Sequence, residues 1–504
     1  MPEYLLGTDN GGTLAKAALF DTEGRQLAVA SRKTEMLSPR PGHTERRMDE
    51  MWQATAESIR QVLAEAKVDP ADVACAAAAG HGNGLYLVDK QGRPVRNGII
   101  STDTRAKDYV ARWNAEGVHR KVLPKTMQCL WPGQPNALLA WLRDHEPEVV
   151  ERAGWALMCK DYVRLRLTGQ FHSELTDASG TSLMDVGRGE YDDEVLAAFG
   201  VGQMRDLLPP VVRSEAICGT VTARAAAETG LAEGTPVAGG LFDIDACGLA
   251  SGVLQEGQLS MVAGTWGIAQ YVSKTPVVEE DHFMTSRYCI PGYYLIPEAS
   301  PTSASNLEWF VTQFFQAERE AAQQQGRSVY DLCNELVAGT EPDEAGIVFL
   351  PFLFGSNAAP EARACLLGLG GWHTRGHVLR AIYEGVVFGH KAHVDRLLRY
   401  RGPFASIRLA GGAARSRPWV QVFADCFGAP VEIPAGSELG ALGAAICAGV
   451  AVGLFPDYPA AVAGMVKLDR VQQPDPALKD LYAEKLALLL FTTNKRLFSG
   501  RGLA

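Results

Sequence analysis

Two strand–turn–strand units, about half a chain apart, constrain the fold more than any other feature of this 504-residue sequence. The first covers residues 4–26, YLLGTDNGGTLAKAALFDTEGRQ, in which two apolar runs flank a turn with paired glycines. The second covers residues 256–274, EGQLSMVAGTWGIAQYVSK, and its turn again carries glycine and threonine. Such a repeat of one supersecondary unit predicts two similar domains that face each other across a cleft.

Apolar strand patterns alternate with helical patterns along most of the chain. Residues 49–67 have a helical pattern, and the apolar run at residues 73–80 follows as a strand. This alternation predicts an α/β fold. Pro and Gly at residues 234–240 precede the second unit, so we place the boundary near residue 250. The expected domains are therefore residues 1–250 and 251–504.

Composition excludes several classes of protein. The net charge is -10 and no block is rich in Lys and Arg, which argues against a nucleic-acid partner. The first residues lack a signal-peptide pattern, so we expect a cytoplasmic protein. The longest uncharged run, residues 439–456, is rich in Gly and Ala and predicts a closely packed buried helix rather than a membrane span. Ten scattered cysteines without a C-x-x-C pair predict reduced thiols.

The first turn has the residue types of a phosphate site. Gly11 and Gly12 let backbone N–H groups point into a concavity that binds phosphate oxygens, and the Thr13 hydroxyl adds a donor. Asp9 would repel a phosphate directly, but it suits a divalent cation placed between the two, usually Mg²⁺ with retained waters. The alternative is a hairpin turn whose residues serve only positive φ angles.

A third segment, residues 407–425, IRLAGGAARSRPWVQVFAD, reads as a strand, a double glycine and a helix. This arrangement lets a flat ligand lie against bare backbone at a helix N-terminus, although a packing turn is an equal alternative. The sequence has no Gly-Lys dipeptide and no complete G-x-G-x-x-G. A P-loop NTPase and a standard Rossmann dehydrogenase are therefore disfavoured.

Five segments, in order along the chain, resemble the FGGY carbohydrate kinases, relatives of glycerol kinase and xylulokinase. They are GTDNGGT (7–13), GLFDIDACGLASG (240–252), AGTWG (263–267), AIYEGVVFG (381–389) and LAGGAARSRPWVQVFAD (409–425). Further segments resemble the branch of L-xylulose kinase, 3-keto-L-gulonate kinase and xylulokinase: MLSPRPGHTERRM (36–48), NGIISTDTRA (97–106), TPVAGGLFD (235–243) and EASPTSASNLEWF (298–310). The resemblance implies two ribonuclease H-like domains of the actin/hexokinase type that flank a nucleotide and sugar cleft.

The resemblance also implies an activity. We expect an ATP-dependent kinase that transfers the γ-phosphate to a terminal hydroxyl of a ketopentose or related keto sugar in carbohydrate catabolism, with ATP and Mg²⁺. The alternatives are a kinase of another sugar or polyol, such as ribulose, erythritol or glycerol, and a non-catalytic actin-like nucleotide-binding protein. The expected partners are small molecules, with neither nucleic acid nor membrane. Family members are often dimers, and the sequence leaves the choice between monomer and homodimer open.

The resemblance assigns the catalytic base to Asp243. In a strand, Asp243 and Asp245 would face the same side, so that each would raise the pKa of the other. A pair of acids in a surface loop is the alternative. Asp9 matches the catalytic-site aspartate that is associated with Mg²⁺, through water.

The resemblance also distributes the nucleotide contacts over both domains. The first phosphate loop falls on Gly11, Gly12 and Thr13. The second phosphate loop falls on Gly264 and Thr265 of the second domain. Gly411 and Gly412 are expected to lie against the adenosine, with Ser416 near the ribose or adenine.

The sugar is expected to bind in the first domain. The segment AAGHGNGLYLVD (78–89) matches the place where family members hold the polyol, and it offers His81 and Asn83. Asp103 and Trp131 are further pocket candidates. A structural histidine at residue 81 and a core tryptophan at residue 131 are the alternatives. His390 and His393 lie one helical turn apart but have no evident third ligand, so we do not expect zinc.

Overall fold

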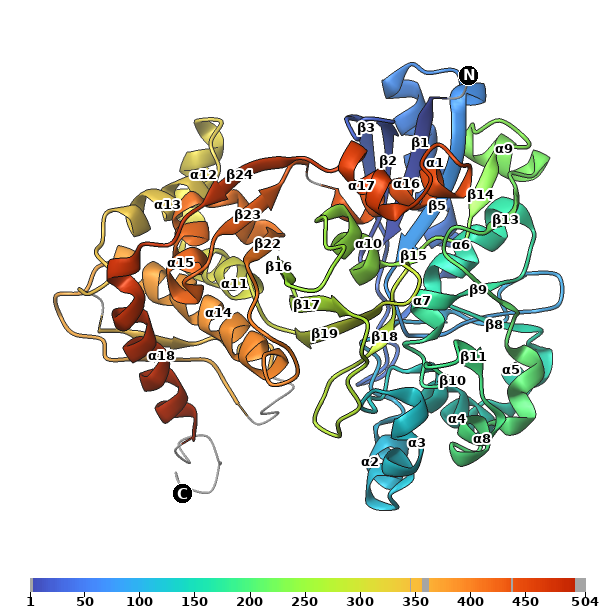
Figure 1. Ribbon diagram of the computed structural model, residues 1–504, viewed down its shortest axis with the longest axis horizontal. Helices are drawn as coiled ribbons and strands as arrows, with labels where there is room; N and C mark the ends of the chain where they lie inside the picture. Colours follow the sequence, from blue (N-terminus) through green and yellow to red (C-terminus); the bar gives the residue numbers. More distant parts are fainter. Residues whose placement is uncertain (1–2, 345, 356–361, 437, 495–504) are drawn as a thin grey trace. The chain divides into compact units, whose positions relative to one another are not determined.

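The computed structural model describes residues 3–344, 346–355, 362–436 and 438–494, and the chain divides into two compact units (Figure 1). Unit 1 comprises Met1–Leu254, Val272–Ile296 and Gly436–Lys467. Unit 2 comprises Gln255–Tyr271, Pro297–Ala435 and Leu468–Ala504. Unit 1 thus contains the N-terminal half of the chain together with two later segments.

Unit 1 is built on a seven-stranded sheet in the order β13-β14-β5-β1-β2-β3, with β15 also paired to β5. The strands are β1 (Tyr4–Asn10), β2 (Leu14–Asp21), β3 (Gln26–Lys33), β5 (Val73–Gly80), β13 (Ile217–Thr220), β14 (Pro236–Ala238) and β15 (Leu241–Phe242). β1 pairs antiparallel with β2 and parallel with β5. The predicted first strand–turn–strand unit is therefore confirmed as a hairpin whose first strand also pairs with a parallel strand.

The two faces of β1 are covered by different helices, because successive side chains of a strand point to opposite faces. Leu6 belongs to a core formed with α1 (Met48–Ala66), and Thr55 of α1 donates to Asn10 Oδ1 at 2.8 Å. On the other face, Gly7 lies directly against α16 (Leu439–Ala451). The predicted buried, closely packed helix at the uncharged run is thus confirmed, and it covers the sheet of unit 1.

Small residues let α16 approach its neighbours. A Cβ atom on Gly7 would lie 1.8 Å from the carbonyl oxygen of Ala441. A Cβ on Gly443 would lie 2.2 Å from the carbonyl oxygen of Ala246, which belongs to helix α10 (Asp243–Ala250). Helix α16 therefore holds β1 and α10, which carry Asp9 and Asp243, close to each other.

We expect Gly443→Ala to destabilise unit 1 and to lower turnover. Overpacking of a core by one methyl group costs about 1–3 kcal/mol, and here the displaced element is α10. Thermal unfolding and the rate of ADP release measure the two effects. Gly402→Ala is the control, because nothing lies within 4 Å of a Cβ there. Equal melting temperatures for the two variants would contradict this packing argument.

The rest of unit 1 includes a second, largely helical core and several short strand pairs. The helices are α2 (Lys107–Ala115), α3 (Val118–Thr126), α4 (Pro135–His145), α5 (Pro147–Arg152), α6 (Cys159–Thr168), α7 (Leu175–Ala178), α8 (Asp193–Ala198), α9 (Ala223–Thr229) and α17 (Tyr458–Met465), with 3-10 turns η1 (Pro70–Asp72) and η2 (Gly202–Leu207). The short strands are β4 (Glu45–Arg46), β6 (Tyr86–Val88), β7 (Gly98–Ile99), β8 (Trp155–Leu157), β9 (Ser173–Glu174), β10 (Met184–Asp185), β11 (Glu190–Tyr191) and β12 (Val211–Val212).

Unit 2 repeats the strand pattern of unit 1. Strands run in the order β17-β16-β22-β23-β24, and β16 pairs antiparallel with β17 and parallel with β22, as β1 does with β2 and β5. Their bounds are β16 (Gln258–Ala263), β17 (Gly267–Ser273), β22 (Ser406–Ala410), β23 (Val431–Pro434) and β24 (Leu468–Gln472). The predicted repeat of the supersecondary unit is therefore confirmed.

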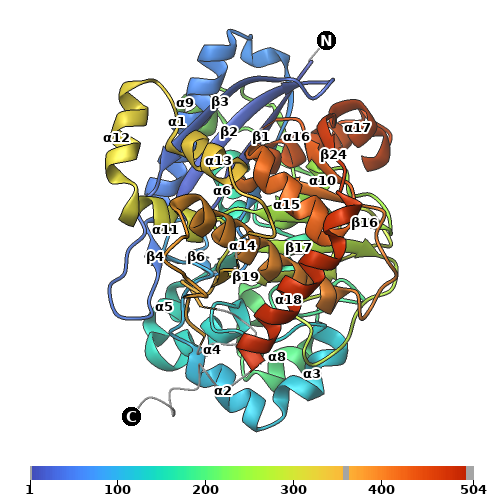
Figure 2. The same ribbon diagram turned by 90° about the vertical axis from the view of Figure 1, so that its left-hand side faces the viewer.

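Helices pack side by side in unit 2, and Figure 2 shows α14, α15 and α18 in this arrangement. The helices are α11 (Ser305–Phe314), α12 (Gln316–Gln324), α13 (Val329–Ala338), α14 (Arg375–Leu397), α15 (Arg417–Phe427) and α18 (Lys479–Asn494), with 3-10 turns η3 (Gly412–Arg415) and η4 (Pro476–Leu478). The remaining described strands of the chain are β18 (Ser286–Arg287) of unit 1, β19 (Tyr294–Ser300), which begins in unit 1 and ends in unit 2, and β20 (Val348–Leu350) and β21 (Cys365–Leu367) of unit 2. Within the described ranges, no helix is both long and apolar enough to cross a membrane. All ten cysteines are free, as expected.

Candidate functional site

The β1–β2 turn of unit 1 carries the residues expected to bind phosphate. The Gly11 N–H donates to the carbonyl of Leu14 at 3.0 Å, which closes the turn. Gly11 and Gly12 are partly exposed and Thr13 is exposed, so the backbone of this turn is accessible. Asp9 lies just before the turn, half-buried, and its carboxylate lies over Gly440, where a Cβ would come within 2.5 Å of Asp9 Oδ2.

Arg46 supports this turn, and sequence reasoning missed it. Its side chain is almost fully buried, at 1% exposure. Nη2 donates to the carbonyl of Gly11 at 2.8 Å and also to the carbonyl of Gly12. The guanidinium therefore fixes the two carbonyls of the glycine pair. Its segment, MLSPRPGHTERRM, indicated a branch of the family but gave no sign of this contact.

Asp243 is the first residue of helix α10, and this corrects one expectation. We expected Asp243 and Asp245 in a strand with both side chains on one face. Residues two apart on a helix point in nearly opposite directions, so the two carboxyl groups do not share a face. Asp243 is half-buried, whereas Asp245 is fully buried, and neither carboxyl oxygen of Asp245 has a hydrogen-bond partner among the residues described.

Asp243 and Asp9 are among the carboxyl groups of unit 1 whose pKa values are raised. Burial raises the pKa of Asp243 well above its ordinary value, and the nearby carboxyl groups of Asp9 and Asp177 raise it further. Burial also raises the pKa of Asp9, against the effect of Lys16, which forms an ion pair of 2.9 Å with Glu438. A carboxyl group whose pKa is shifted toward neutrality is suited to general base catalysis.

The predicted sugar loop lies next to the start of α10. A Cβ on Gly82 would come within 2.3 Å of the ring of Phe242, so only glycine fits against that ring. Asn83 is buried with a left-handed φ of 59°, and its side-chain oxygen has no hydrogen-bond partner among the described residues. That orphaned acceptor is available to a sugar hydroxyl.

His81 is buried, and both of its ring nitrogens have protein partners. Nε2 lies 2.8 Å from the Tyr86 hydroxyl and Nδ1 lies 3.3 Å from the carbonyl of Gly82. Burial, with a smaller contribution from Arg46, lowers the pKa of His81 to about 3. These contacts are those of a satisfied structural histidine, and its role toward a sugar stays a prediction.

The two remaining sugar candidates make contacts within the protein. Asp103 is 1% exposed; its carboxylate accepts from Arg105 at 2.9 Å and from the N–H of Thr44 at 2.6 Å. Trp131 stacks on Phe283, with ring centroids 5.1 Å apart. Asp103 therefore has no oxygen free of protein partners, whereas Trp131 is only partly buried.

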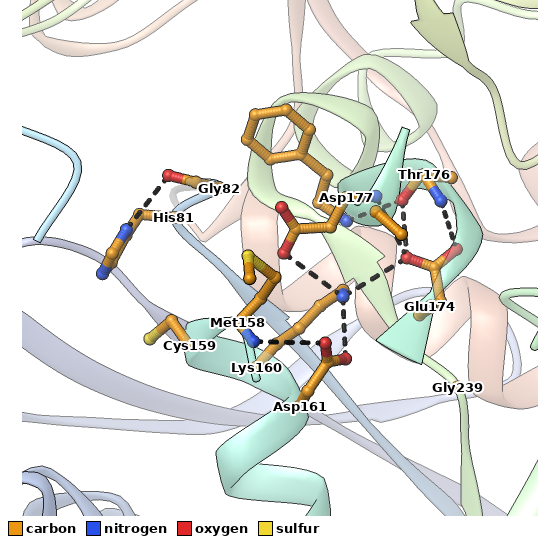
Figure 3. A network of polar contacts seen from close by, with 12 residues as sticks. His81, Gly82, Met158, Cys159, Lys160, Asp161, Glu174, Thr176, Asp177 and Gly239 are labelled. Atoms are coloured by element: carbon orange, nitrogen blue, oxygen red, sulfur yellow. Dashed lines mark hydrogen bonds and ion pairs between the residues drawn. The ribbon is translucent and has the colours of Figure 1, made fainter. Parts of the chain in front are cut away.

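A cluster of buried charged side chains surrounds Lys160 in unit 1, and it was not predicted from the sequence (Figure 3). The Lys160 ammonium lies 3.0 Å from Asp161 Oδ1, 3.4 Å from Glu174 Oε2 and 3.3 Å from Asp177 Oδ2. All four side chains are fully buried. Arg164 adds a second cation, 2.9 Å from Asp161.

Protonation completes the charge balance of this cluster. Burial raises the pKa of Asp177 to about 7. The attraction of Lys160 lowers this pKa, and the repulsion of the carboxylates of Asp161 and Glu174 raises it again. Burial also raises the pKa of Asp245 well above its ordinary value. The two cations are thus matched by two carboxylates when Asp177 and Asp245 hold their protons.

The raised pKa of Asp177 makes the stability of the protein depend on pH. Between its unfolded value of 3.8 and about 7, the unfolded state loses this proton while the folded state keeps it, so stability falls as pH rises and levels off above pH 7. Asp177→Asn removes this effect. We expect the difference in melting temperature, that of Asp177→Asn minus that of the unmodified protein, to increase from pH 4 to pH 8. A difference that stays constant or shrinks with pH would contradict the assignment.

Unit 2 contains a cavity of about 880 Å³ that brings together residues predicted for the second phosphate loop and residues predicted beside the adenosine. The cavity is lined by Gly264, Thr265, Gly412 and Ser416. Gly411 adjoins it with a φ of 91°, where a Cβ would lie 2.6 Å from the carbonyl of Ala263. A volume of this size is typical of cofactor and nucleotide sites.

Ser416 is held by a polar contact that sequence reasoning missed. Its hydroxyl caps α15 by accepting from the N–H of Trp419 at 3.2 Å and lies 2.5 Å from Asn334 Oδ1. Tyr383 also donates to Asn334 Oδ1, at 2.9 Å, and stacks on Trp419. The exposed ring of Trp309 lines the same cavity and is available to a flat base.

Each histidine of the pair on α14 lies near a side chain of the protein. His390 Nε2 lies 2.8 Å from the Ser303 hydroxyl, and burial lowers its pKa to about 3. His393 lies 3.8 Å from Glu298. No group of three or more His, Cys, Asp or Glu side chains in the described residues could hold a metal ion.

A duplicated α/β architecture, a glycine turn beside a carboxylate, and an aspartate at a helix start define a nucleotide-dependent phosphotransferase. The chain belongs to the FGGY family of carbohydrate kinases: the N-terminal domain model matches residues 4–249 and the C-terminal domain model matches residues 259–452. FGGY kinases transfer phosphate from ATP to sugar hydroxyl groups, and the chain is such an enzyme.

Individual relatives agree with this assignment. The chain is 39% identical to L-xylulose/3-keto-L-gulonate kinase of Escherichia coli (strain K12), over 96% of this chain and 95% of that protein. It is 40% identical to a probable L-xylulose kinase of Pasteurella multocida, over 88% and 90% of the two chains. The crystal structure of xylulose kinase from Rhodospirillum rubrum superposes with a TM-score of 0.86 at 27% identity and covers 98% of this chain and 100% of that chain. The predicted family and the actin/hexokinase-like fold class are confirmed.

Proposed function

We propose that this protein phosphorylates the terminal hydroxyl of a ketopentose or related keto sugar of the L-xylulose or D-xylulose class, with Asp243 as general base. The observation that carries the proposal is the position of Asp243, a carboxyl group with a raised pKa at the start of α10, directly after the residue that packs against the sugar loop. Relatives with 38–40% identity are named L-xylulose kinases, which supports this substrate class.

In this mechanism the sugar binds to unit 1 and ATP to unit 2. Asn83 accepts a hydrogen bond from a sugar hydroxyl, and Asp243 takes the proton of the attacking hydroxyl as the bond to the γ-phosphorus forms. The N–H groups of the Gly11–Thr13 turn and of Gly264 and Thr265 donate to phosphate oxygens, and the cavity beside Gly412 and Ser416 holds the adenosine. His81 and Asp103 shape the sugar site.

The residues present also fit a hydrated Mg²⁺. Asp9 offers one carboxylate beside the phosphate turn, and its charge contributes to the raised pKa of Asp243. Mg²⁺ commonly uses one or two carboxylates with water and phosphate oxygens as its other ligands. When bound at Asp9 through water, the ion would neutralise charge between this carboxylate and the phosphates. The protein is expected to act in the cytoplasm, and either a monomer or a homodimer is compatible with this proposal.

An acceptor panel tests the proposal. Release of ADP from Mg-ATP is measured with L-xylulose, D-xylulose, L-ribulose, D-ribulose, 3-keto-L-gulonate, erythritol and glycerol. We expect the highest kcat/KM with one of the xyluloses or the keto sugar acid. A preference for erythritol or glycerol would overturn the substrate class and leave the kinase in place, whereas ATP binding without any turnover would favour the actin-like alternative.

A further inference from the structure

A continuous chain of one ion pair and two hydrogen bonds runs from the Lys160 cluster to the start of α10 (Figure 3). Glu174 Oε2 lies 3.4 Å from the Lys160 ammonium and accepts from the Thr176 hydroxyl at 2.7 Å. The same Thr176 hydroxyl oxygen accepts from the N–H of Phe242 at 2.9 Å. Phe242 is the residue before Asp243, so the chain ends one peptide bond from the proposed base.

The chemistry of the two partners determines the direction of both hydrogen bonds of Thr176. A carboxylate only accepts, so the Thr176 hydroxyl must donate to Glu174 and is left with lone pairs for the N–H of Phe242. Glu174 cannot turn away, because its Oε1 accepts from the N–H of Thr176 at 2.8 Å and from the Ser214 hydroxyl at 2.7 Å. The hydroxyl is therefore held in one orientation by a charge-assisted bond.

Phe242 is the N-cap residue of α10, and its own side chain makes no hydrogen bond that caps the helix. Its ring is wedged between two glycines: a Cβ on Gly82 would come within 2.3 Å of it, and a Cβ on Gly180 would lie 3.7 Å away. Thr176 thus holds the main chain of Phe242 while the sugar loop holds its ring.

We propose that Thr176 is a positioning residue for the phosphoryl transfer: its hydroxyl fixes the backbone of Phe242 and thereby aims the carboxylate of Asp243 at the sugar hydroxyl. This inference rests on the proposed role of Asp243 as base. Thr176 does not touch the substrate in this scheme, and its effect reaches the reaction only through Asp243. The Lys160 cluster keeps Glu174 in place and so keeps Thr176 oriented.

The test compares Thr176→Val, which removes the hydroxyl at nearly equal volume, with Thr176→Ser, which keeps it. We expect Thr176→Val to lower kcat about 10- to 100-fold with little change in the KM values for ATP and sugar, a part of the effect of losing the base itself. Thr176→Ser should stay within about threefold of the unmodified protein, because the oxygen that holds Phe242 is retained.

Thr229→Val is the matched structural control. The Thr229 side chain is also fully buried, and its hydroxyl donates to a carbonyl, that of Ala225, and accepts from a backbone N–H, that of Leu231. Both valine variants should lower the melting temperature, Thr176→Val by more because it loses a charge-assisted bond, but only Thr176→Val should lower kcat. A kcat for Thr176→Val equal to that of Thr229→Val overturns the proposal.

A double-mutant cycle separates this inference from the proposed role of Asp243. In the Asp243→Asn background, Thr176→Val should cause no further loss of the residual turnover, since the group that it positions is already absent. An equal loss in both backgrounds identifies a general structural role and overturns the proposal. If Asp243→Asn alone keeps full turnover, the assignment of Asp243 as the base is wrong. This single variant therefore tests the proposed function independently of Thr176.

Discussion

Asp243→Asn should lower kcat by about 10²- to 10⁴-fold while the Kd for ATP stays the same. An amide has the shape of the carboxylate but cannot take the proton of the attacking hydroxyl. The cavity proposed for the adenosine lies in unit 2 and is not lined by Asp243, so we expect binding of ATP to be insensitive to this change. Steady-state ADP release and calorimetric titration of ATP measure the two quantities.

Asp245→Asn is the matched control in the same helix. Burial already favours the neutral form of Asp245, and an amide is nearly isosteric with a protonated carboxyl group. We therefore expect its kcat to stay within a few-fold of the unmodified protein. If Asp245→Asn lost as much turnover as Asp243→Asn, the base could not be assigned to Asp243 alone.

Lys160→Met should be the most destabilising single change discussed for unit 1. It leaves three buried carboxyl groups, Asp161, Glu174 and Asp177, without the ammonium that contacts all of them. Removal of one partner of a buried ion pair typically costs about 3–5 kcal/mol, because the remaining charge has no compensation. Unfolding in urea, followed by far-UV circular dichroism, should show an earlier transition.

Arg188→Met provides the comparison with an exposed ion pair. Arg188 contacts Glu190 at 2.9 Å, and the two side chains are 67% and 65% exposed. Water replaces the lost partner at such a site, so little change in the unfolding transition is expected. Equal effects of the two substitutions would mean that the Lys160 cluster does not carry the stability assigned to it.

The fold was largely predictable because local patterns decide it. The alternation of strand and helix, the hairpin turn at Gly11 and Gly12, and the small-residue run of α16 each follow from short-range chemistry, and the structure confirms them. The return of two later segments to unit 1 was not visible, since no single stretch of sequence records which distant surface it covers.

The sequence predicted residues of the candidate site only where those residues belong to a family motif. Asp243 was assigned from the family segment. The sequence interpretation placed it in a strand, whereas it lies at the start of a helix, because the short segment LFDIDAC fits either element. Arg46, Lys160 and Thr176 act through contacts with residues far away in the sequence. Their positions become meaningful only once the chain is folded.

The placement of α16 affects how the protein is made. When residues 1–254 have left the ribosome, every strand of the first sheet exists, but the helix that covers Gly7 has not yet been synthesised. At about 5–20 residues per second, translation needs about 10–40 seconds more to reach the end of α16. Throughout that interval the nascent chain exposes an apolar sheet face, which makes it a client for chaperones and gives the N-terminal half on its own a tendency to aggregate.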